Sequence, residues 1–308
     1  MALQKHILII GGGFLGRNFA ETFHQAGFPV ALFSRSLPQK GQKLAGVKYF
    51  AGDFLNGEDL REPLAGAKAV IHCLSSTTPR SGDLDPARDI ENNLVGTVKL
   101  LDYMVELGIP KLVYCSSGGT VYGESSHSRE EDRKEPICSY GITKLAVEKY
   151  IWLYHKRHGL SFQVLRISNP YGPYQQVKNQ LGVINTFLNK ILENKPIKVF
   201  GDGETARDYI YIEDLNKIVL SLYQKDSWDL FINIASGKTT TLKEICHLLG
   251  KITGKNLEVI YEKERLCDLK ISSLNIEKLK ELLPQLSFTP IERGMKLHYK
   301  HLLDEKEG

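Results

Sequence analysis

Residues 6–16 read HILIIGGGFLG, and this stretch decides the fold of the 308-residue chain. A short run of isoleucine and leucine bounded by glycine predicts a buried strand, and the amphipathic segment after it predicts a helix. Gly11, Gly13 and Gly16 have the spacing G-x-G-x-x-G, which permits a tight turn, close approach of a diphosphate and close helix–strand packing. Because the first amide groups of a helix lack partners within it, the turn predicts a dinucleotide-binding site.

Short apolar runs alternate with helix-length amphipathic segments beyond this turn. Hydrophobic residues make up 42% of the chain, which is enough for a packed interior. Helices are predicted at 14–25, 90–107 and 140–158. The alternation predicts an α/β fold with a Rossmann-type doubly wound parallel sheet. Its buried strands are predicted at 6–10, 30–34, 47–51, 69–73, 111–116 and 162–167.

The sequence pattern changes after Ile167, where a loop rich in proline and glycine precedes shorter predicted elements. We expect a dinucleotide-binding domain over residues 1–179, to which 206–234 return. Residues 180–205 and 235–308 are expected to form a smaller, substrate-binding lobe.

Composition argues against several classes of protein. The net charge of +4 comes without a dense basic patch, so no nucleic-acid partner is expected. Apolar runs are too short to span a membrane, and the amino terminus lacks a signal-peptide pattern, so we expect a cytoplasmic protein. Without a CxxC pair, the cysteines predict neither a disulfide framework nor a metal site: Cys73, Cys115, Cys138, Cys246 and Cys267.

The end of the second predicted strand bears on the choice of dinucleotide. NAD-binding folds place an acidic residue there to bind the ribose hydroxyls. This chain has Ser34 followed by Arg35. A small hydroxyl beside a guanidinium suits a 2′-phosphate, which favours NADP, with NAD as the alternative. Asp53, after the third strand, could accept a hydrogen bond from the adenine amino group or simply end a strand.

A tyrosine and a lysine four residues apart open a predicted helix. Tyr140 and Lys144 would lie on one helix face, where an ammonium lowers the pKa of a phenol whose ordinary pKa is about 10. Such a tyrosine exchanges a proton with a substrate hydroxyl while a nicotinamide exchanges hydride. Residues 115–123, CSSGGTVYG, end the fifth strand and supply nearby hydroxyls.

These motifs together resemble the extended short-chain dehydrogenase/reductases of the NAD(P)-dependent epimerase/dehydratase family. The resemblance covers nearly the whole chain and implies an enzyme that acts on a nucleotide-diphosphate sugar. Relatives commonly form homodimers through the helices that correspond to 90–107 and 140–158. The matching stretches are 11–16, 52–53, 92–97, 116–123, 140–144, 166–174, 201–214 and 265–268.

The resemblance also implies roles for further residues. It places the side chains or backbone of several residues beside the cofactor: Phe14, Leu15, Phe54, Leu74, Asn93 and Ile167. It places others beside the sugar or its diphosphate: Ser75, Thr120, Asn169, Arg207 and Arg265.

Departures from the family pattern help to choose the reaction. The usual first glycine is Ile10 here, and the usual catalytic hydroxyl falls at Gly118, so Ser117 or Thr120 must supply it; we favour Ser117. Related dehydratases carry an Asp-Glu pair where this chain has Gly118 and Gly119, which argues against dehydration.

Two redox reactions at C4 of the sugar remain. We favour an NADPH-dependent reductase of a nucleotide-diphosphate 4-keto hexose, because Ser34 and Arg35 suit an exchangeable NADPH. A UDP-hexose 4-epimerase with tightly bound NAD is the alternative. A catalytically idle dinucleotide sensor is a remote third, since a sensor has no need of Tyr140 and Lys144.

Overall fold

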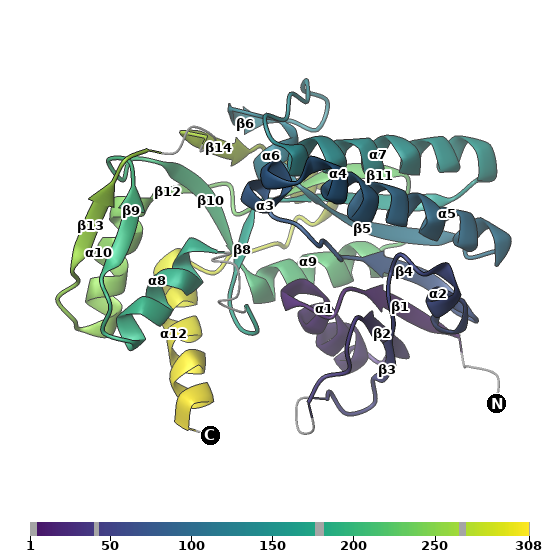
Figure 1. Cartoon of the computed structure of the whole chain (residues 1–308), viewed down its shortest axis with the longest axis horizontal. Helices are drawn as coiled ribbons and strands as arrows, with labels where there is room; N and C mark the ends of the chain where they lie inside the picture. Colours follow the sequence, from purple (N-terminus) through teal and green to yellow (C-terminus); the bar gives the residue numbers. More distant parts are fainter. Residues whose placement is uncertain (1–4, 40–42, 176–181, 265–268, 308) are drawn as a thin grey trace.

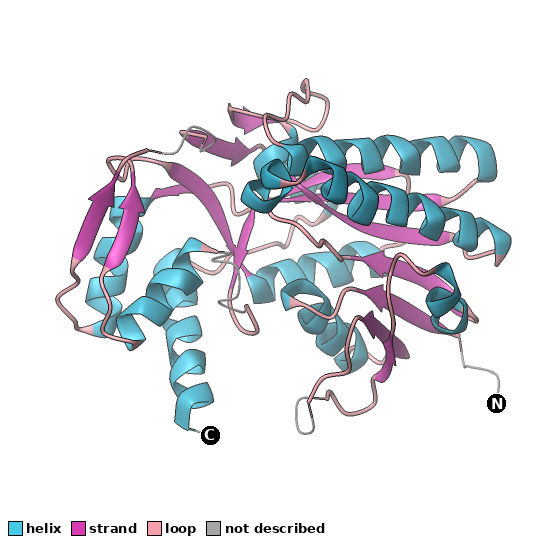
Figure 2. Ribbon diagram, viewed as in Figure 1, coloured by secondary structure: helices cyan, strands magenta, loops and turns pink. Residues whose placement is uncertain are grey.

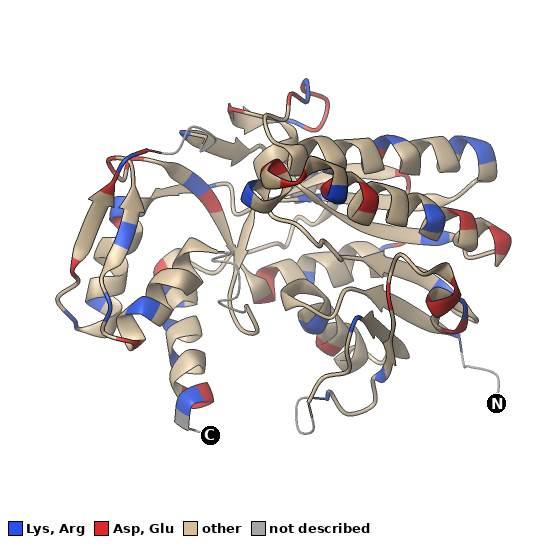
Figure 3. Cartoon of the chain, in the orientation of Figure 1, with Lys and Arg blue, Asp and Glu red and all other residues tan. Residues whose placement is uncertain are grey.

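The computed structural model describes residues 5–39, 43–175, 182–264 and 269–307. Two lobes lie side by side, with the larger one built on a parallel sheet (Figures 1 and 2). No helix in these ranges is long and apolar enough to cross a membrane. Lys and Arg alternate with Asp and Glu over both lobes (Figure 3).

The larger lobe contains a seven-stranded sheet whose strands all pair in parallel, in the order β11-β7-β5-β4-β1-β2-β3. The fold class predicted from the sequence is confirmed. The chain order reverses between β1 and β4, and ligands of such sheets bind at that switch point. The strands are β1 (His6–Ile10), β2 (Val30–Ser34), β3 (Lys48–Ala51), β4 (Ala67–His72), β5 (Lys111–Ser117), β7 (Ser161–Ile167) and β11 (Leu230–Ile234).

Helices cover both faces of this sheet because its strands alternate their side chains between two cores. In β1, Ile7 and Ile9 pack under α1 (Phe14–Gln25) and α9 (Ile212–Gln224). Leu8 and Ile10 join the core of the other face. That face is covered by α2 (Gly57–Leu64), α5 (Gly96–Glu106) and α7 (Ser139–His158).

The predicted helix at 90–107 begins with a π-helical turn. A short α4 (Pro86–Asp89) leads into a π-helical turn, η1 (Ile90–Val95), before α5 begins. The Asn93 amide and the Thr97 hydroxyl each donate to the backbone carbonyl four residues earlier, of Asp89 and Asn93. Side chains that compete for these carbonyls disturb the regular ladder, and π turns often mark functional sites.

The smaller lobe has two further sheets. Strands β6 (Ser125–Ser128), β8 (Asn169–Tyr171), β10 (Ala206–Tyr211), β12 (Thr239–Thr241) and β14 (Ile271–Leu274) form one, and β9 (Ile197–Phe200) pairs with β13 (Val259–Glu262). Thus β11 and α9 return to the large lobe, whereas β10 does not join the large sheet. The remaining helices are α3 (Pro79–Leu84), α6 (Gly118–Val121), α8 (Val183–Leu192), α10 (Leu242–Thr253), α11 (Glu277–Leu282) and α12 (Ile291–Glu307).

A buried ion pair ties α7 to the large sheet. Arg166 of β7 and Glu148 of α7 lie 2.7 Å apart, and both side chains are almost fully buried. Glu148 also accepts a hydrogen bond from the Ser116 hydroxyl of β5 (2.6 Å). Arg166 donates to the Tyr122 hydroxyl, which donates to Asn233 of β11. These contacts fix α7 beneath the carboxyl ends of β5 and β7.

Candidate active site

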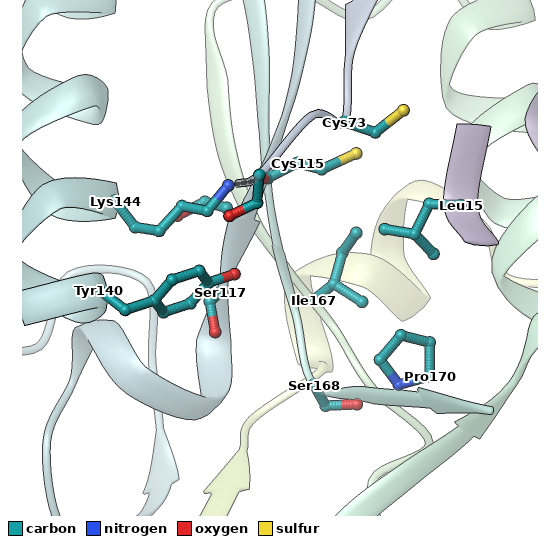
Figure 4. Close-up of a pocket in the computed structure, with 11 residues that line it drawn as sticks. Leu15, Cys73, Cys115, Ser117, Tyr140, Lys144, Ile167, Ser168 and Pro170 are labelled. Carbon is teal, nitrogen blue, oxygen red and sulfur yellow. Dashed lines mark hydrogen bonds between the residues drawn. The ribbon is translucent and has the colours of Figure 1, made fainter. Parts of the chain in front are cut away.

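Helix α7 carries Tyr140 and Lys144 on its first turns, as the spacing predicted. Both side chains project toward the carboxyl end of β5, while Leu15 of α1 approaches from the opposite side (Figure 4). A cavity of about 150 Å³ separates the two sides. It is lined by Leu15, Cys73, Ser75, Cys115, Ser116, Ser117, Tyr140, Lys144, Ile167, Ser168 and Pro170.

The Lys144 ammonium is buried, with 4% of the residue exposed. Its Nζ donates to the carbonyl oxygen of Cys115 (2.9 Å) and lies 5.6 Å from the centroid of the Tyr140 ring. Burial lowers the pKa of Lys144 to about 8. The side chain is therefore still charged at neutral pH, although a small rise in pH discharges it.

Burial also raises the pKa of Tyr140 above its ordinary value, while a hydrogen bond with Ser75 opposes that shift. The phenol is therefore neutral at pH 7 in this structure. A neutral phenol can donate a proton to a keto oxygen, and it needs the nearby Lys144 charge to become a base.

The hydroxyl expected near Tyr140 has two candidate sources. Ser117 ends β5 and lines the cavity, whereas the Thr120 Oγ1 of α6 is buried without a hydrogen-bond partner in the described residues. A Cβ at Gly118 would lie 2.4 Å from the Leu274 Cδ1 and 2.9 Å from the Arg166 carbonyl oxygen. The usual family position therefore has no room for a side chain unless the Leu274 side chain moves aside and the β7 backbone shifts.

The glycine turn has the close contacts that its spacing predicts. Gly11 has φ 110°, and a Cβ on it would lie 2.7 Å from the Leu74 backbone nitrogen. A Cβ on Gly16 would meet the Gly11 carbonyl oxygen at 1.7 Å. Gly13 precedes α1 with open space around it, so its backbone is accessible beside Phe14 at the helix start. This cradle fits the diphosphate of a dinucleotide.

The end of β2 lies against the same turn. A Cβ on Gly12 would be 2.8 Å from the Ser34 Cβ, so Ser34 directly faces the glycines. The Ser34 hydroxyl donates to the Ser36 carbonyl (2.7 Å), and Arg35 is exposed. Asp53 is also exposed and caps its own turn by accepting from the Leu55 amide (3.0 Å).

Three more predicted cofactor residues lie in the interior. The Phe54 ring is buried against His72, which leaves only its backbone for a ligand. Asn93 is buried, and its Oδ1 accepts from the Ser76 amide (3.0 Å) in the loop after β4. Ile167 ends β7 and lines the cavity.

Of the predicted substrate residues, Ser75 lines the cavity and Thr120 lies on α6, whereas Asn169 and Arg207 lie on strands of the smaller lobe. Asn169 of β8 donates to the Asp208 carbonyl of β10 (3.0 Å). The Arg207 guanidinium, also on β10, donates to the backbone carbonyls of Ala206, Leu269 and Lys270. Arg265 lies outside the described residues.

Two features of the site were not predicted. The Ser168 hydroxyl lines the cavity and is buried without a hydrogen-bond partner among the described residues. Asp89 is completely buried and receives hydrogen bonds from several side chains around the site. Ser168 follows the last residue of a predicted strand, which was an available signal. A single aspartate in a helical segment gave none.

Comparison with known proteins agrees with this geometry. Residues 7–235 match the model of the NAD dependent epimerase/dehydratase family. The chain belongs to this family. It is 30% identical to a putative UDP-glucose 4-epimerase of Methanocaldococcus jannaschii, covering 90% of this chain and 92% of that one. It is 32% identical to the dTDP-4-dehydro-6-deoxyglucose reductase of Escherichia coli, covering 79% and 80%.

A solved structure extends the similarity to the whole fold. The UDP-glucose 4-epimerase of Thermus thermophilus, in complex with NAD, superposes with a TM-score of 0.91 at 27% identity, covering 97% of this chain and 99% of that one. The predicted family and the prediction of an enzyme are confirmed. Family membership establishes a nucleotide-sugar epimerase, reductase or dehydratase that depends on NAD(P).

The shifted pKa of Lys144 predicts how stability depends on pH. Between the folded pKa of about 8 and the ordinary 10.5, the unfolded chain binds more protons, so Lys144 makes the free energy of unfolding rise with pH. Below pH 8 its burial costs about 3 kcal/mol. We expect Lys144→Met to stabilise the protein most at pH 7, and the gain to shrink toward pH 10.

Chemical denaturation at several pH values measures this difference. Lys149→Met, an exposed change on the same helix, is the matched control and should follow the wild type. If the free energy of unfolding of Lys144→Met differed from that of the wild type by the same amount at every pH in this range, the result would contradict a buried Lys144 ammonium with a lowered pKa.

Proposed function

We propose that the chain is a 4-epimerase of a nucleotide-diphosphate hexose. The observation that carries the proposal is the convergence of Tyr140, Lys144 and Ser117 on one small cavity at the carboxyl ends of the central strands. The likeness to UDP-glucose 4-epimerases over almost the whole chain supports epimerisation as the net reaction. UDP-glucose or a related UDP-hexose is the proposed substrate.

NAD is the proposed cofactor, and when bound it supplies a hydride acceptor and donor. The backbone of Gly11, Gly13 and Gly16 would hold its diphosphate at the start of α1. NAD bound in the related Thermus thermophilus epimerase supports this choice. Other proposed cofactor residues are Phe14, Leu15, Ser34, Arg35, Asp53, Phe54, Leu74, Asn93, Tyr140, Lys144 and Ile167.

Tyr140 is the proposed proton carrier. As a base it accepts the proton of the C4 hydroxyl, and as an acid it returns that proton to the C4 oxygen. Lys144 keeps its charge at neutral pH and stabilises the phenolate that forms in the first step. Ser117, which lines the cavity, is proposed to orient the C4 oxygen in place of a residue at position 118, with Thr120 as its alternative.

The diphosphate of the substrate is proposed to lie toward the smaller lobe. Asn169 and Arg207 are on β8 and β10, which pair with each other beside the cavity residue Pro170. A guanidinium suits a diphosphate because it donates hydrogen bonds in pairs. Ser75, Thr120 and Arg265 are also proposed to contact the substrate.

A reductase of a nucleotide-diphosphate 4-keto sugar is the second candidate, and the end of β2 favours it. No acidic residue follows Ser34, and the exposed Arg35 is proposed to bind the 2′-phosphate of NADPH. The 32% identity to an Escherichia coli 4-keto sugar reductase also supports it. In that reaction Tyr140 acts only as the acid.

A homodimer is proposed because exposed apolar side chains gather on neighbouring helices. α5 and α7 pack side by side on the outer face of the large lobe (Figure 1). Apolar patches of this kind mark interaction surfaces. Exposed apolar residues on or beside these helices include Ile90, Val95, Val105, Leu107, Ile142, Tyr150 and Trp152.

The net reaction is tested by the cofactor and the product. The purified protein should release NAD on denaturation and interconvert UDP-glucose and UDP-galactose without added cofactor. Tyr140→Phe should lower kcat by about 10³-fold, because it removes the proton carrier. NAD content should stay unchanged in that variant. If the purified protein contains no NAD and oxidises NADPH in the presence of a nucleotide-diphosphate 4-keto sugar, the result contradicts the epimerase and supports the reductase.

The cofactor preference is tested at Arg35. If Arg35 binds a 2′-phosphate, Arg35→Ala weakens NADPH binding by about tenfold and NADH binding by less than about twofold, because one charge-assisted contact is lost. Fluorescence titration measures both. Equal effects on the binding of the two nucleotides would show that Arg35 does not distinguish NADPH from NADH.

The dimer is tested by placing charges on the proposed interface. Ile142→Glu combined with Tyr150→Glu should convert the dimer to a monomer in analytical ultracentrifugation, because a buried charge opposes association. Ile260→Glu is the control, since Ile260 is 39% exposed on β13 of the other lobe. A wild-type protein that sediments as a monomer would contradict the proposed interface.

A further inference from the structure

A buried carboxylate lies behind the catalytic helix. Asp89 ends α4 and is 0% exposed. No lysine, arginine or histidine of the described residues lies within ion-pair distance of it. A buried charge without a counter-ion is costly unless hydrogen bonds solvate it. Asp89 therefore depends on the groups that surround it.

Side-chain donors solvate both oxygens of this carboxylate. Oδ1 accepts from the Asn93 amide (2.8 Å) and from the Thr77 hydroxyl. Oδ2 accepts from the hydroxyls of Ser139 (2.8 Å) and Thr143 (2.9 Å). The donors come from the loop after β4, from η1 and from α7. One carboxylate thus joins three segments that are separate in the sequence.

The contacts on α7 lie directly beside the proton-transfer pair. Ser139 precedes Tyr140, and Thr143 precedes Lys144. Both donors point to the same oxygen, so they fix the rotation of the first turn of the helix about its axis. The directions of the Tyr140 and Lys144 side chains follow from that rotation.

The contacts on the loop reach the same tyrosine from the other side. Asn93 donates to Asp89 and the Thr77 hydroxyl (2.9 Å), and it accepts from the Ser76 amide (3.0 Å). Ser75 precedes this amide, lines the cavity beside Tyr140 and opposes the rise in the pKa of the phenol that burial causes. Asp89 therefore holds both the helix that carries Tyr140 and the loop that lines the same cavity.

We propose that Asp89 is a positioning residue of the active site, whose carboxylate sets the first turn of α7 against the loop after β4. It touches neither the cavity nor the reacting atoms, and it acts through Ser139, Thr143, Asn93 and Thr77. The kinetic part of this proposal rests on the proposed function. The structural part does not, because it concerns the protein without ligands.

The two oxygens allow two variants with different outcomes. Asp89→Ala removes every acceptor. In Asp89→Asn, the amide oxygen can replace Oδ1, and the amide nitrogen can donate to the Ser139 and Thr143 hydroxyls after these rotate. The asparagine therefore keeps the anchor and removes only the charge. Asp83 is the matched control, because its exposed carboxylate accepts from the Ser139 backbone amide (2.8 Å) at the same helix end.

Kinetics distinguish an anchor from a general structural role. We expect Asp89→Ala to lower kcat by about 10²-fold, the scale of a small misplacement of reacting groups, with KM changed less than about threefold. Asp89→Asn should recover kcat to within about tenfold of the wild type, and Asp83→Ala should stay within about twofold. A kcat for Asp89→Ala within twofold of wild type overturns the proposal, as does a folded Asp89→Asn that is no better than Asp89→Ala.

If Asp89→Ala does not fold, Thr143→Val replaces it. Valine keeps the shape of threonine and removes one donor, so kcat should fall by about fivefold, and a kcat unchanged in this variant overturns the proposal.

Hydrogen exchange tests the anchor without substrate or cofactor. Residues 140–145 and 75–78 should exchange faster in Asp89→Ala than in wild type, and in these ranges Asp89→Asn and Asp83→Ala should resemble wild type. Unchanged exchange in a folded Asp89→Ala overturns the proposal. Faster exchange in a protein that turns over no nucleotide sugar keeps the anchor and rejects the proposed function instead.

The charge of Asp89 has a separate readout at Lys144. Asp89 raises the pKa of Lys144, so its replacement by asparagine should move the Lys144 titration below about 8, while Asp83→Asn should not. NMR of isotope-labelled lysine in the ligand-free protein measures this, and an unmoved midpoint in Asp89→Asn contradicts the proximity. The other groups that face Lys144 stay in place in all variants: His72, Cys73, Tyr114, Cys115, Tyr140 and Glu148.

Discussion

The ion pair between Arg166 and Glu148 is the contact on which the rest of the site depends. Both charges of the pair are buried. Glu148 also accepts a hydrogen bond from the Ser116 hydroxyl, and Arg166 also donates one to the Tyr122 hydroxyl. Removing one partner of such a pair leaves an uncompensated charge, which costs several kcal/mol. Because the pair spans α7 and β7 and reaches β5, it fixes the helix that carries Tyr140 and Lys144 against the strand ends that form the cavity.

Apart from that pair, the buried charges of Lys144 and Asp89 are stabilised by neutral groups. The Lys144 ammonium is solvated by a backbone carbonyl, and the Asp89 carboxylate is solvated by hydroxyls and an amide. Neither has a direct ion-pair partner among the described residues. A lysine held in this way loses its proton readily, so the electrostatic field at Tyr140 responds to small changes around it. This would suit the proposed role of Tyr140 as both base and acid.

The fold was predictable because its signals are local. Apolar runs bounded by glycine located the parallel strands to within a few residues, and the i, i+4 spacing placed Tyr140 and Lys144 together. What escaped prediction depends on contacts between distant segments. The hydrogen bonds that Asp89 accepts from Thr77, Ser139 and Thr143, and those that Arg207 donates to the Leu269 and Lys270 carbonyls, join residues that no sequence period relates. The π turn at η1 is local, but it depends on side-chain hydrogen bonds to backbone carbonyls, which the apolar pattern does not indicate. The net reaction was equally beyond reach, since epimerase and reductase share one set of proton-transfer residues.

The contact between Gly118 and Leu274 has a consequence for how such sites diversify. Leu274 belongs to β14 of the smaller lobe, yet it occupies the space that a side chain at position 118 of the larger lobe would need. A serine at position 118 requires the Leu274 side chain to move aside, or a smaller residue at 274, together with a small shift of the β7 backbone. Position 118 of the larger lobe and position 274 of the smaller lobe are therefore not free to vary separately: a side chain at 118 requires an accommodating change at 274.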